Sequence, residues 1–466
     1  MATPNTHYGA KNIARMLSGA RSIFFAGIGG VNMSSLALIS KLRGFKVGGS
    51  DTGVTDVTRA LEASGITVFH THDAANLEGY DAMVYTVAIS PENPEYKAAL
   101  MSGIPCISRA DYLGYVMMGY QNRLGVSGMH GKSTCTSMCA LAYMEACADP
   151  TVLSGARLDA MGGAYRIGGE EFFIFEACEY MDSFLDFNPT TAIILNIEMD
   201  HVDYFKSMTQ IRRSYSNFAA ITGADGCCIY NADDENVRLV MLTYGGKPVS
   251  FALKDENADY RAVNISVDRG RPSFDVCAFG EIVAHVDLSV CGNHNIYNAL
   301  AAFAAAHTAG LDATLIARGL SRFTGAGRRM EYKGSISGAA VYDDYGHHPT
   351  EVATTLDGFR QMGYDRMICV FQPHTYSRTA ELFSDFATAL DVADKVVVAE
   401  IYAAREVDAL GVSAQRLAAA IGEKAVALPS FEAIAEYIRQ NAREGDLVVV
   451  MGAGDIYKVF PLLDLK

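Results

Sequence analysis

A glycine-rich segment at residues 125–134 carries the clearest chemical pattern in the sequence. It reads GVSGMHGKST and lies between a strand-like run and a helix-like run. Glycines let the backbone curl so that its amides face phosphate oxygens, while a lysine neutralises terminal phosphates and a hydroxyl reaches Mg²⁺. The segment predicts a variant phosphate-binding loop, and a tight turn that binds nothing is the alternative. Its candidate residues are Gly128, Met129, His130, Gly131, Lys132, Ser133 and Thr134.

A second glycine-rich segment near the N-terminus is typical of nucleotide-diphosphate binding. Gly29 and Gly30 follow the strand-like run SIFFAG, and Asp51 follows the next strand-like run about twenty residues later. In this pattern a helix N-terminus receives a diphosphate and the acid receives a ribose hydroxyl. Asn32 replaces the third glycine, so the pattern favours NAD no more than any other nucleotide diphosphate. A structural turn is the alternative.

Acidic and histidine side chains follow two further strand-like runs. Glu176 lies near the end of FFIFEAC. Glu198, Asp200, His201 and Asp203 follow TAIILNI. Ligands in open parallel sheets collect at the carboxyl ends of strands, so both groups are expected beside the phosphate-binding loop. Such oxygen-rich sites suit Mg²⁺. The alternatives are a solvated carboxylate for Glu176 and a hydrogen-bonded core histidine for His201.

Four later segments combine histidine, acidic and arginine residues. They are GNHNIYNAL at residue 292, RRME at 328, DDYGHHPTE at 343 and QPHTYSRT at 372. The acid and histidine pairs suggest a transition metal, but their spacing is not the one typical of zinc. Arg378 suits carboxylate recognition through its planar fork. Ordinary exposed loops are the alternative for each segment.

The order of the expected elements predicts an α/β fold with three domains. Strand-like and helix-like runs alternate in each part, as in parallel sheets covered by helices. The predicted domains are a Rossmann-like domain at 1–120, a P-loop ATPase-type domain at 121–329 and a second Rossmann-like domain at 330–466. Within the central domain, residues 250–290 alternate polar and apolar side chains around a turn-rich DRGRP, which predicts a small antiparallel wing.

Composition restricts the class of protein further. The 466 residues carry a formal net charge of −15, which argues against nucleic acid as the main partner. Ten cysteines show no C-x-x-C pair or regular framework, so we expect reduced thiols in a cytoplasmic protein. The N-terminus has no signal-peptide pattern, and glycines, serines and Asn32 interrupt the uncharged run at 22–40. We therefore expect no membrane insertion.

Taken together, these segments resemble the Mur ligase family over essentially the whole chain. No single motif would suffice, but eleven occur in the family's order. They are GIGG at 27, SRADYL at 108, GMHGKST at 128, EACEYMDSF at 176, NIEMDHVDYF at 196, GNHNIYNALAA at 292, RRMEY at 328, DDYGHHPTE at 343, QPHTYSRT at 372, IYAARE at 401 and GAGDIY at 452.

The resemblance implies an ATP-dependent ligase of peptidoglycan precursor synthesis that needs Mg²⁺. ATP would phosphorylate the lactyl carboxylate of UDP-N-acetylmuramate, and the amine of L-alanine would attack the acyl phosphate and release phosphate. The N-terminal domain would bind the UDP-sugar and the central domain would bind ATP. The C-terminal domain would help to bind ATP and would bind the amino acid. We expect the cytoplasmic protein to be a monomer or homodimer.

The same resemblance assigns roles to individual residues. Lys132 would hold the β and γ phosphates, Ser133 and Glu176 would ligate one Mg²⁺, and His201 would ligate a second. Two departures stand out: the family commonly has glycine at the positions of Asn32 and Ser35 and often arginine at that of Thr375. The remaining assignments are His294, Asn295 and Asn298 to adenine, Arg329 and Asp344 to phosphates and ribose, His348 and Arg378 to alanine, and Gly29, Gly30, Asp51 and His72 to the UDP part.

Three other functions stay open from the sequence. A recycling ligase of the same family would add a tripeptide to the same sugar nucleotide, although the tyrosine of DDYGHHPTE and the EACEY segment favour the alanine reaction. An NAD-dependent oxidoreductase would leave GMHGKST unexplained. A nucleotide-binding regulator without ligase activity would leave HHPTE and GNHN unexplained.

Overall fold

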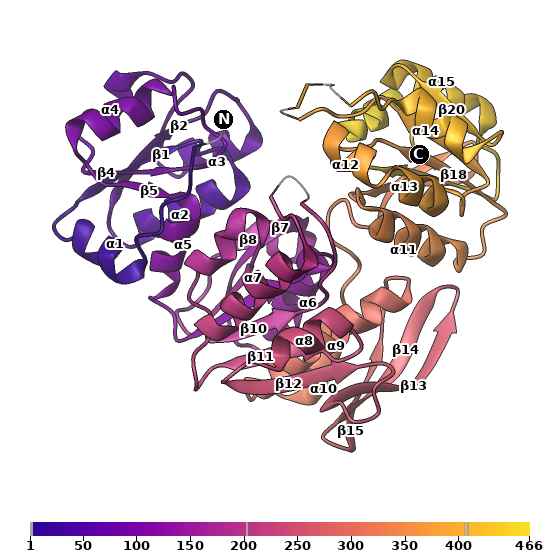
Figure 1. The fold of residues 1–466 in the computed structure, drawn as a ribbon, viewed down its shortest axis with the longest axis horizontal. Coiled ribbons are helices and arrows are strands. Elements are labelled where there is room, and N and C mark those ends of the chain that lie inside the picture. The colour runs from indigo at the N-terminus through magenta and orange to yellow at the C-terminus, as the bar shows by residue number, and fades with distance from the viewer. Residues whose placement is uncertain (1–2, 202–203, 405, 408–409) are drawn as a thin grey trace.

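The computed structural model describes residues 3–201, 204–404, 406–407 and 410–466 in three lobes, each built on its own sheet (Figure 1). In this view the N-terminal lobe (indigo) and the C-terminal lobe (orange to yellow) lie on either side above the central lobe. Strands and helices alternate in all three lobes. The predicted α/β architecture is therefore confirmed.

The N-terminal lobe contains a five-stranded parallel sheet in the order β3-β2-β1-β4-β5. Alternate side chains of the central strand β1 enter different apolar clusters. Ile23 and Phe25 belong to one cluster, and Phe24 and Ala26 belong to the other. Both faces of the sheet are therefore covered, as a parallel sheet requires. The elements are α1 (Ala10–Met16), β1 (Ser22–Ala26), α2 (Val31–Leu42), β2 (Lys46–Ser50), α3 (Asp56–Ala63), β3 (Thr67–Phe69), η1 (Ala74–Leu77), β4 (Ala82–Tyr85), α4 (Pro94–Ser102), β5 (Cys106–Ser108) and α5 (Arg109–Met117).

The central lobe contains a ten-stranded sheet in the order β15-β14-β13-β12-β11-β10-β6-β9-β7-β8. The strands from β12 to β7 in this order are parallel, and β8 is antiparallel to β7. The elements up to β12 are β6 (Asn122–Ser127), α6 (Lys132–Glu145), β7 (Thr151–Leu158), η2 (Asp159–Met161), β8 (Gly163–Arg166), β9 (Phe172–Glu176), η3 (Tyr180–Asp186), β10 (Thr191–Ile194), α7 (Met208–Ile221), β11 (Cys227–Asn231), α8 (Glu235–Met241) and β12 (Lys247–Ala252).

The predicted wing is an antiparallel extension of the same sheet. It comprises β13 (Tyr260–Asp268), β14 (Arg271–Ala278) and β15 (Glu281–Asp287), which pair antiparallel in sequence order. The start of β13 also pairs in parallel with the end of β12. The wing is therefore joined to the central sheet by backbone hydrogen bonds as well as by the chain.

Helix α9 (Asn293–Thr308) packs against α6 through small side chains and is almost wholly buried. Most residues of its sequence NALAAFAAA are alanines, and such small side chains permit close contact between the helix backbones. The adjacent helix is α10 (Ala313–Ser321). Because α9 begins beside the phosphate-binding loop, this packing fixes the distance between its first turn and that loop.

The C-terminal lobe contains a six-stranded sheet in the order β16-β17-β21-β18-β19-β20. Only β16 runs antiparallel to its neighbour; the other pairs are parallel. Ser430 caps the helix that follows it, accepting the Ala433 amide proton. The elements are β16 (Glu331–Ile336), β17 (Ala339–Asp344), α11 (Pro349–Arg360), β18 (Arg366–Phe371), α12 (Tyr376–Glu381), α13 (Phe383–Leu390), β19 (Lys395–Ala399), α14 (Ala414–Ile421), β20 (Ala425–Leu428), α15 (Phe431–Asn441), β21 (Asp446–Met451) and η4 (Ile456–Leu462).

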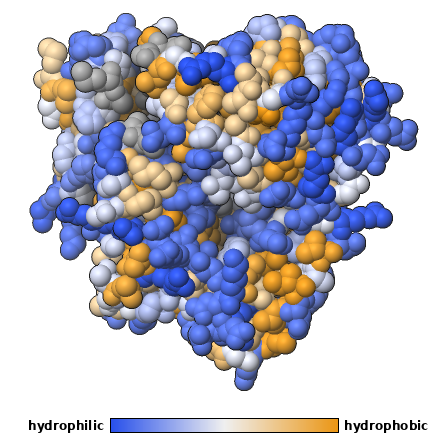
Figure 2. Space-filling model, turned by 45° about the vertical axis from the view of Figure 1, so that its right-hand side comes forward, coloured by the Kyte–Doolittle hydropathy of each residue, from blue (hydrophilic) through white to orange (hydrophobic). Residues whose placement is uncertain are grey.

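The face shown in Figure 2 is mainly hydrophilic, and its apolar residues gather in small patches, one of them at the lower right. Exposed apolar side chains in small groups are ordinary on water-soluble folds. Among the described helices, none is both long and apolar enough to cross a lipid bilayer. The uncharged run at 22–40 instead forms β1, a glycine turn and most of α2.

A buried carboxylate ties the N-terminal segment to α5. Asp111 accepts the amide protons of Tyr8 (2.7 Å) and Gly9 (3.1 Å) and the hydroxyl proton of Thr6 (2.9 Å). It has no exposed surface. A carboxylate that accepts three hydrogen bonds in the interior contributes strongly to stability, because its loss leaves three donors without a partner.

We therefore expect Asp111→Ala to lower the free energy of unfolding by about 3 kcal/mol, since hydrogen bonds to charged groups are the costly ones to lose. Thermal unfolding followed by circular dichroism measures the shift. The control is Asp56→Ala, which removes an exposed carboxylate paired with Arg59 in the same lobe and should cost about 0.5 kcal/mol or less. Equal shifts for the two variants would contradict the role of Asp111.

Candidate functional site

The phosphate-binding loop leaves β6 and begins α6. Gly131 occupies the N-cap position with φ 84°, and Gly128 has φ 138°. A Cβ on Gly128 would lie 2.9 Å from the Leu195 side chain, so glycine is required there by both conformation and space. The first amides of α6 therefore face the concave side of the loop, where an anion can bind.

Glu176 lies beside this loop because β9 pairs with β6. Val126 is the register partner of Glu176, the last residue of β9. The Ser133 hydroxyl donates to Glu176 Oε2 at 3.0 Å, while Glu176 Oε1 accepts from the Ser154 hydroxyl and the Gly155 amide. A hydroxyl and a carboxylate thus converge at the start of α6, which is an oxygen-rich pair of the type that binds Mg²⁺.

Lys132 is held by the buried carboxylate of Glu179, which was not among the predicted site residues. Its Nζ lies 3.0 Å from Oε2 of Glu179 and also donates to the Met129 carbonyl oxygen at 3.0 Å. His201 Nε2 lies 3.0 Å from Glu179 Oε1. Burial raises the pKa of Glu179, but the charges of Lys132 and His201 outweigh it and hold that pKa below its usual value. The second glutamate of EACEY was the only sequence signal for this residue.

A cavity of about 590 Å³ collects these groups. Ser133, Glu176 and His201, the predicted Mg²⁺ ligands, all line it, and so does Lys132. Cationic and polar side chains from residues 328–351 complete the lining of this cavity. These further lining residues are Arg328, Arg329, Tyr345, His347 and Glu351.

A second cavity of about 330 Å³ adjoins the first. Gly131, Arg329 and Glu351 line both cavities, so they form a common wall. The two cavities thus lie next to each other. Predicted adenine, ribose and phosphate residues that line the second cavity are His130, Thr134, His294, Asn295, Asn298 and Asp344.

The polar side chains at the start of α9 are positioned by one another. Asn295 donates to the Cys291 carbonyl oxygen at 2.7 Å, and Asn298 donates to Asn295 Oδ1 at 3.1 Å. Burial and the charge of Arg329 lower the pKa of His294 to about 4. His294 is therefore neutral near pH 7 and offers one donor and one acceptor, as recognition of an uncharged base requires.

Arg329 and Asp344 lie on the C-terminal side of the common wall. Arg329 Nη1 is 3.6 Å from Glu351 Oε1. Asp344, at the end of β17, accepts the amide protons of Met330 (2.9 Å) and Gly346 (2.8 Å). These two amides hold the Asp344 carboxylate in a fixed orientation beside Arg329.

His348 and Arg378, predicted to lie near the amino acid, do not line either cavity among the described residues. Arg378 donates from Nε (3.2 Å) and Nη2 (3.0 Å) to Asp200 Oδ1, which joins the C-terminal lobe to the central lobe. Asp200 and the neighbouring His347 do line the larger cavity. His347 belongs to the same HHP segment, of which only His348 was predicted to lie in the site. Asp203 and Arg405, which belong to two of the quoted motifs, lie outside the described residues.

Residues predicted for the UDP part surround the turn after β1. Gly29 donates its amide proton to Asp51 Oδ2 at 3.0 Å, and Gly53 donates to Oδ1 of the same carboxylate. Gly30 is the N-cap of α2. His72 Nδ1 lies 2.9 Å from Oε2 of Glu95, which is fully buried. These residues thus form one cluster at the carboxyl ends of β1 and β2.

Several non-glycine residues with positive φ lie in or next to the larger cavity. The values are 51° for His201 and 57° for Arg328, which line it, and 49° for Met330, which lies between the lining residues Arg329 and Glu331. Left-handed backbone at such residues costs energy and concentrates at functional sites. This supports a function for the region independently of the side-chain chemistry.

Three family descriptions match successive parts of the chain. Residues 22–121 match the Mur ligase family, catalytic domain; residues 126–306 match the Mur ligase middle domain; residues 328–454 match the Mur ligase, glutamate ligase domain. The matches follow one another in the order of the three lobes.

Named relatives are similar over nearly the whole chain. The UDP-N-acetylmuramate–L-alanine ligase of Lachnospira eligens is 44% identical over 94% of this chain and 96% of its own. That of Clostridium novyi is 43% identical over the same shares. Among solved structures, UDP-N-acetylmuramate-alanine ligase from Thermotoga maritima has a TM-score of 0.79 at 28% identity, covering 95% of this chain and 97% of that one. A murein peptide ligase from Psychrobacter arcticus has a TM-score of 0.72 at 25% identity, covering 95% and 98%.

The lowered pKa of His294 predicts an acid-dependent loss of stability. Between pH 6.5 and about 4 the unfolded chain binds a proton at this histidine and the folded chain does not, so stability falls as the pH is lowered through this range. The full shift corresponds to about 3 kcal/mol, and partial exposure of the ring reduces the expected loss to about 2 kcal/mol. Denaturant unfolding of the wild type and His294→Gln at pH 7 and pH 4.5 measures it. Identical pH dependence in both proteins would contradict a buried neutral His294.

Proposed function

The chain belongs to the Mur ligase family, and from this premise we propose that it catalyses ATP-dependent ligation of L-alanine to UDP-N-acetylmuramate in peptidoglycan precursor synthesis. One observation carries the substrate assignment: identity of 42–44% over 94% of the chain to ligases named for this reaction. The family also accounts for the phosphate-binding loop, which an NAD-dependent oxidoreductase leaves unexplained. The motifs of the C-terminal lobe likewise have a role in a ligase and none in a simple nucleotide-binding regulator.

The reaction has two steps in this proposal. The lactyl carboxylate attacks the γ-phosphorus of ATP, which breaks the bond to ADP and gives an acyl phosphate. The amine of L-alanine then attacks the acyl carbon, the amide bond forms and phosphate leaves with the electrons of the broken C–O bond. Phosphoryl transfer depends mainly on positioning and on neutralising charge at the phosphoryl oxygens. The larger cavity suits this requirement because it contains Lys132, Arg328 and Arg329.

ATP binding would use both cavities. The adenine would lie against His294, Asn295 and Asn298, with the ribose near Asp344. The phosphates would then follow the loop amides of residues 128–134 past Arg329 into the larger cavity. Lys132 would turn from the loop carbonyl oxygens to the β and γ phosphates while keeping its contact with Glu179.

The donor set at the loop fits Mg²⁺. The Ser133 hydroxyl and the Glu176 carboxylate lie 3.0 Å apart on the cavity wall and would hold one ion, and His201 would hold a second. When bound, Mg²⁺ offsets the negative charge that develops on the transferred phosphoryl group. Glu179 would keep both Lys132 and His201 oriented through its two carboxylate oxygens.

The other substrates would bind at the two remaining parts of the site. Gly29, Gly30, Asp51 and His72 would contact the UDP part. The carboxylate of L-alanine would compete with Asp200 for Arg378, close to His348, which precedes α11. Ten described cysteines are free thiols, as is typical of the cytoplasm, where we place the enzyme as a monomer or homodimer.

The direct test measures phosphate release with UDP-N-acetylmuramate, ATP and Mg²⁺, in parallel with L-alanine and with the tripeptide of the recycling ligases. We expect release with L-alanine and none above background with the tripeptide. Lys132→Ala is the negative control and should lower turnover by about 10³-fold or more, because the phosphates lose their main cation. Release that depends on the tripeptide alone, or on neither amine, would overturn the proposal.

Arg378→Ala should raise the KM for L-alanine by about 10- to 100-fold, the effect of losing a charge-assisted contact to a carboxylate, with a much smaller effect on the KM for ATP. Arg360→Ala is the matched control: it removes an exposed arginine of the same lobe that pairs with Asp394, and both KM values should remain unchanged. A parallel rise of both KM values in Arg378→Ala would show a structural role for the contact with Asp200.

A further inference from the structure

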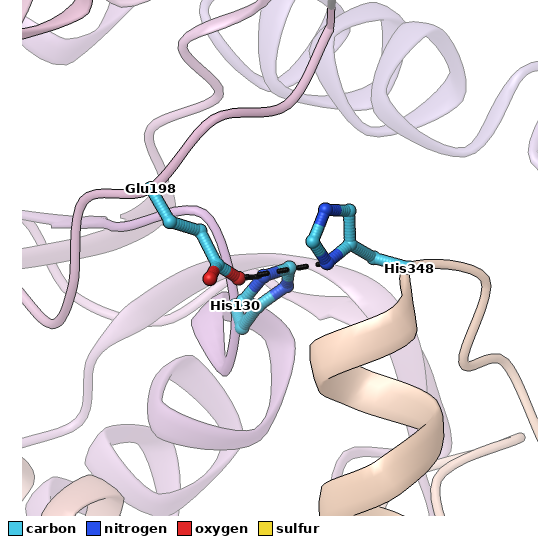
Figure 3. A group of neighbouring side chains, drawn as sticks. All are labelled: His130, Glu198 and His348. Carbon is cyan, nitrogen blue, oxygen red and sulfur yellow. Dashed lines mark hydrogen bonds and ion pairs between the residues drawn. The ribbon is translucent and has the colours of Figure 1, made fainter. Parts of the chain in front are cut away.

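A cluster of two histidines and a glutamate lies where the central lobe meets the C-terminal lobe, apart from the predicted Mg²⁺ ligands (Figure 3). His130 belongs to the phosphate-binding loop, Glu198 follows β10, and His348 precedes α11. One ligand atom of each lies within 4.8 Å of the others. We propose that these three side chains form a binding site for a zinc-type divalent cation that joins the two lobes.

The facing atoms are those that a borderline metal ion prefers. His130 Nε2 contacts Glu198 Oε1 directly, and His348 Nδ1 lies 3.6 Å from the same oxygen. The two imidazole rings have centroids 4.9 Å apart and are tilted by 36°. Two imidazole nitrogens and one carboxylate oxygen make a ligand set known for zinc, with a fourth position left for water. The dashed lines of Figure 3 converge on the glutamate oxygen from both rings.

Neighbouring groups orient the three ligands. His130 Nδ1 lies 3.1 Å from Glu351 Oε1 and Nε2 contacts Glu198, so an ion would take the place of the proton between Nε2 and Glu198 while Nδ1 keeps its carboxylate partner. The Thr350 hydroxyl donates to Glu198 Oε2 at 3.1 Å. The Thr350 amide donates to His348 Nδ1 at 3.3 Å, so this nitrogen carries a lone pair and no proton, and an ion bound there would take the place of that long hydrogen bond. A carboxylate behind a ligating histidine is the usual outer support of a metal site.

The site is shielded but can be reached. The side chains of His130, Glu198 and His348 are 15%, 33% and 6% exposed. His130 and Glu198 also line the smaller cavity, which provides an entry path for an ion. The predicted Mg²⁺ ligands Ser133 and Glu176 line the other cavity and offer oxygen atoms. The two sites therefore favour different metal ions: the histidine cluster is rich in nitrogen ligands, and the predicted Mg²⁺ site is rich in oxygen ligands.

Sequence spacing alone does not reveal this site, because its ligands come from three segments more than sixty residues apart. The HHP segment supplies only one of them. An ion bound here would hold the phosphate-binding loop and the start of α11 in the arrangement of Figure 3. The proposed site does not depend on the proposed reaction, since its formation needs neither nucleotide nor amino acid.

The experiment is a titration of the metal-free full chain with Co²⁺, a spectroscopic substitute for Zn²⁺, in the absence of nucleotide. We expect one equivalent to produce the strong visible absorption of four-coordinate cobalt without a thiolate charge-transfer band. Zn²⁺ should abolish this absorption and excess Mg²⁺ should leave it. His348→Asn keeps a good helix N-cap but removes the ring nitrogen, and Glu198→Gln removes the carboxylate. Each of these two single variants should weaken Co²⁺ binding by about 10-fold or more.

Two variants serve as matched controls. His201→Gln removes the histidine of the predicted Mg²⁺ site, and His285→Gln removes an exposed histidine that contacts two carboxylates in the wing. Both should retain the cobalt spectrum, and circular dichroism verifies that all four variants fold. A spectrum of six-coordinate cobalt, a thiolate band, loss of the signal in His201→Gln, or unchanged affinity in folded His348→Asn and Glu198→Gln would overturn the proposal. Ligase activity is measured separately, so failure of this site and failure of the proposed function are distinguishable.

Discussion

The parallel pairing of β6 with β9 on one side and β10 on the other is the constraint on which the site depends. The register places Val126 opposite Glu176 and Ser127 opposite Ile194, so three strands end at the same level. The loop after β6 then has an acidic side chain on one flank and the segment that carries Glu198, Asp200 and His201 on the other. A shift of one residue in either pairing would turn these side chains to the opposite face of the sheet.

The parts of the site that could be predicted from sequence are those that act through local conformation. Glycines, a lysine and a hydroxyl in one loop define phosphate binding without knowledge of the rest of the fold, and the position of Glu176 follows from its place at a strand end. Glu179 and Glu351 could not be found in this way, because an acidic residue becomes functional only when folding buries it against a cation. Arg378 illustrates the same limit: its residue type indicated carboxylate recognition, but its partner Asp200 is set by the packing of two lobes.

The net charge of −15 acquires a more specific meaning from these pairs. Lys132 contacts Glu179, Arg329 contacts Glu351 and Arg378 contacts Asp200, so these cations already have anionic partners. An anionic substrate would therefore bind at cations that are already paired: it would displace Asp200 from Arg378 and join Glu179 at Lys132. Part of the cost of removing water from these cations is already met on folding. Affinity then depends on geometry and on loop amides more than on the overall field of the protein.

The wall formed by Gly131, Arg329 and Glu351 has a practical consequence for inhibitor design. Because these residues line both the proposed adenine chamber and the one that holds Lys132, two weak fragments, one bound in each chamber, can be linked over a short distance. Linking makes the second binding event intramolecular and raises the combined affinity without new contacts. Rigid linkers that cross beside Arg329 would gain most, since they lose the least conformational freedom on binding.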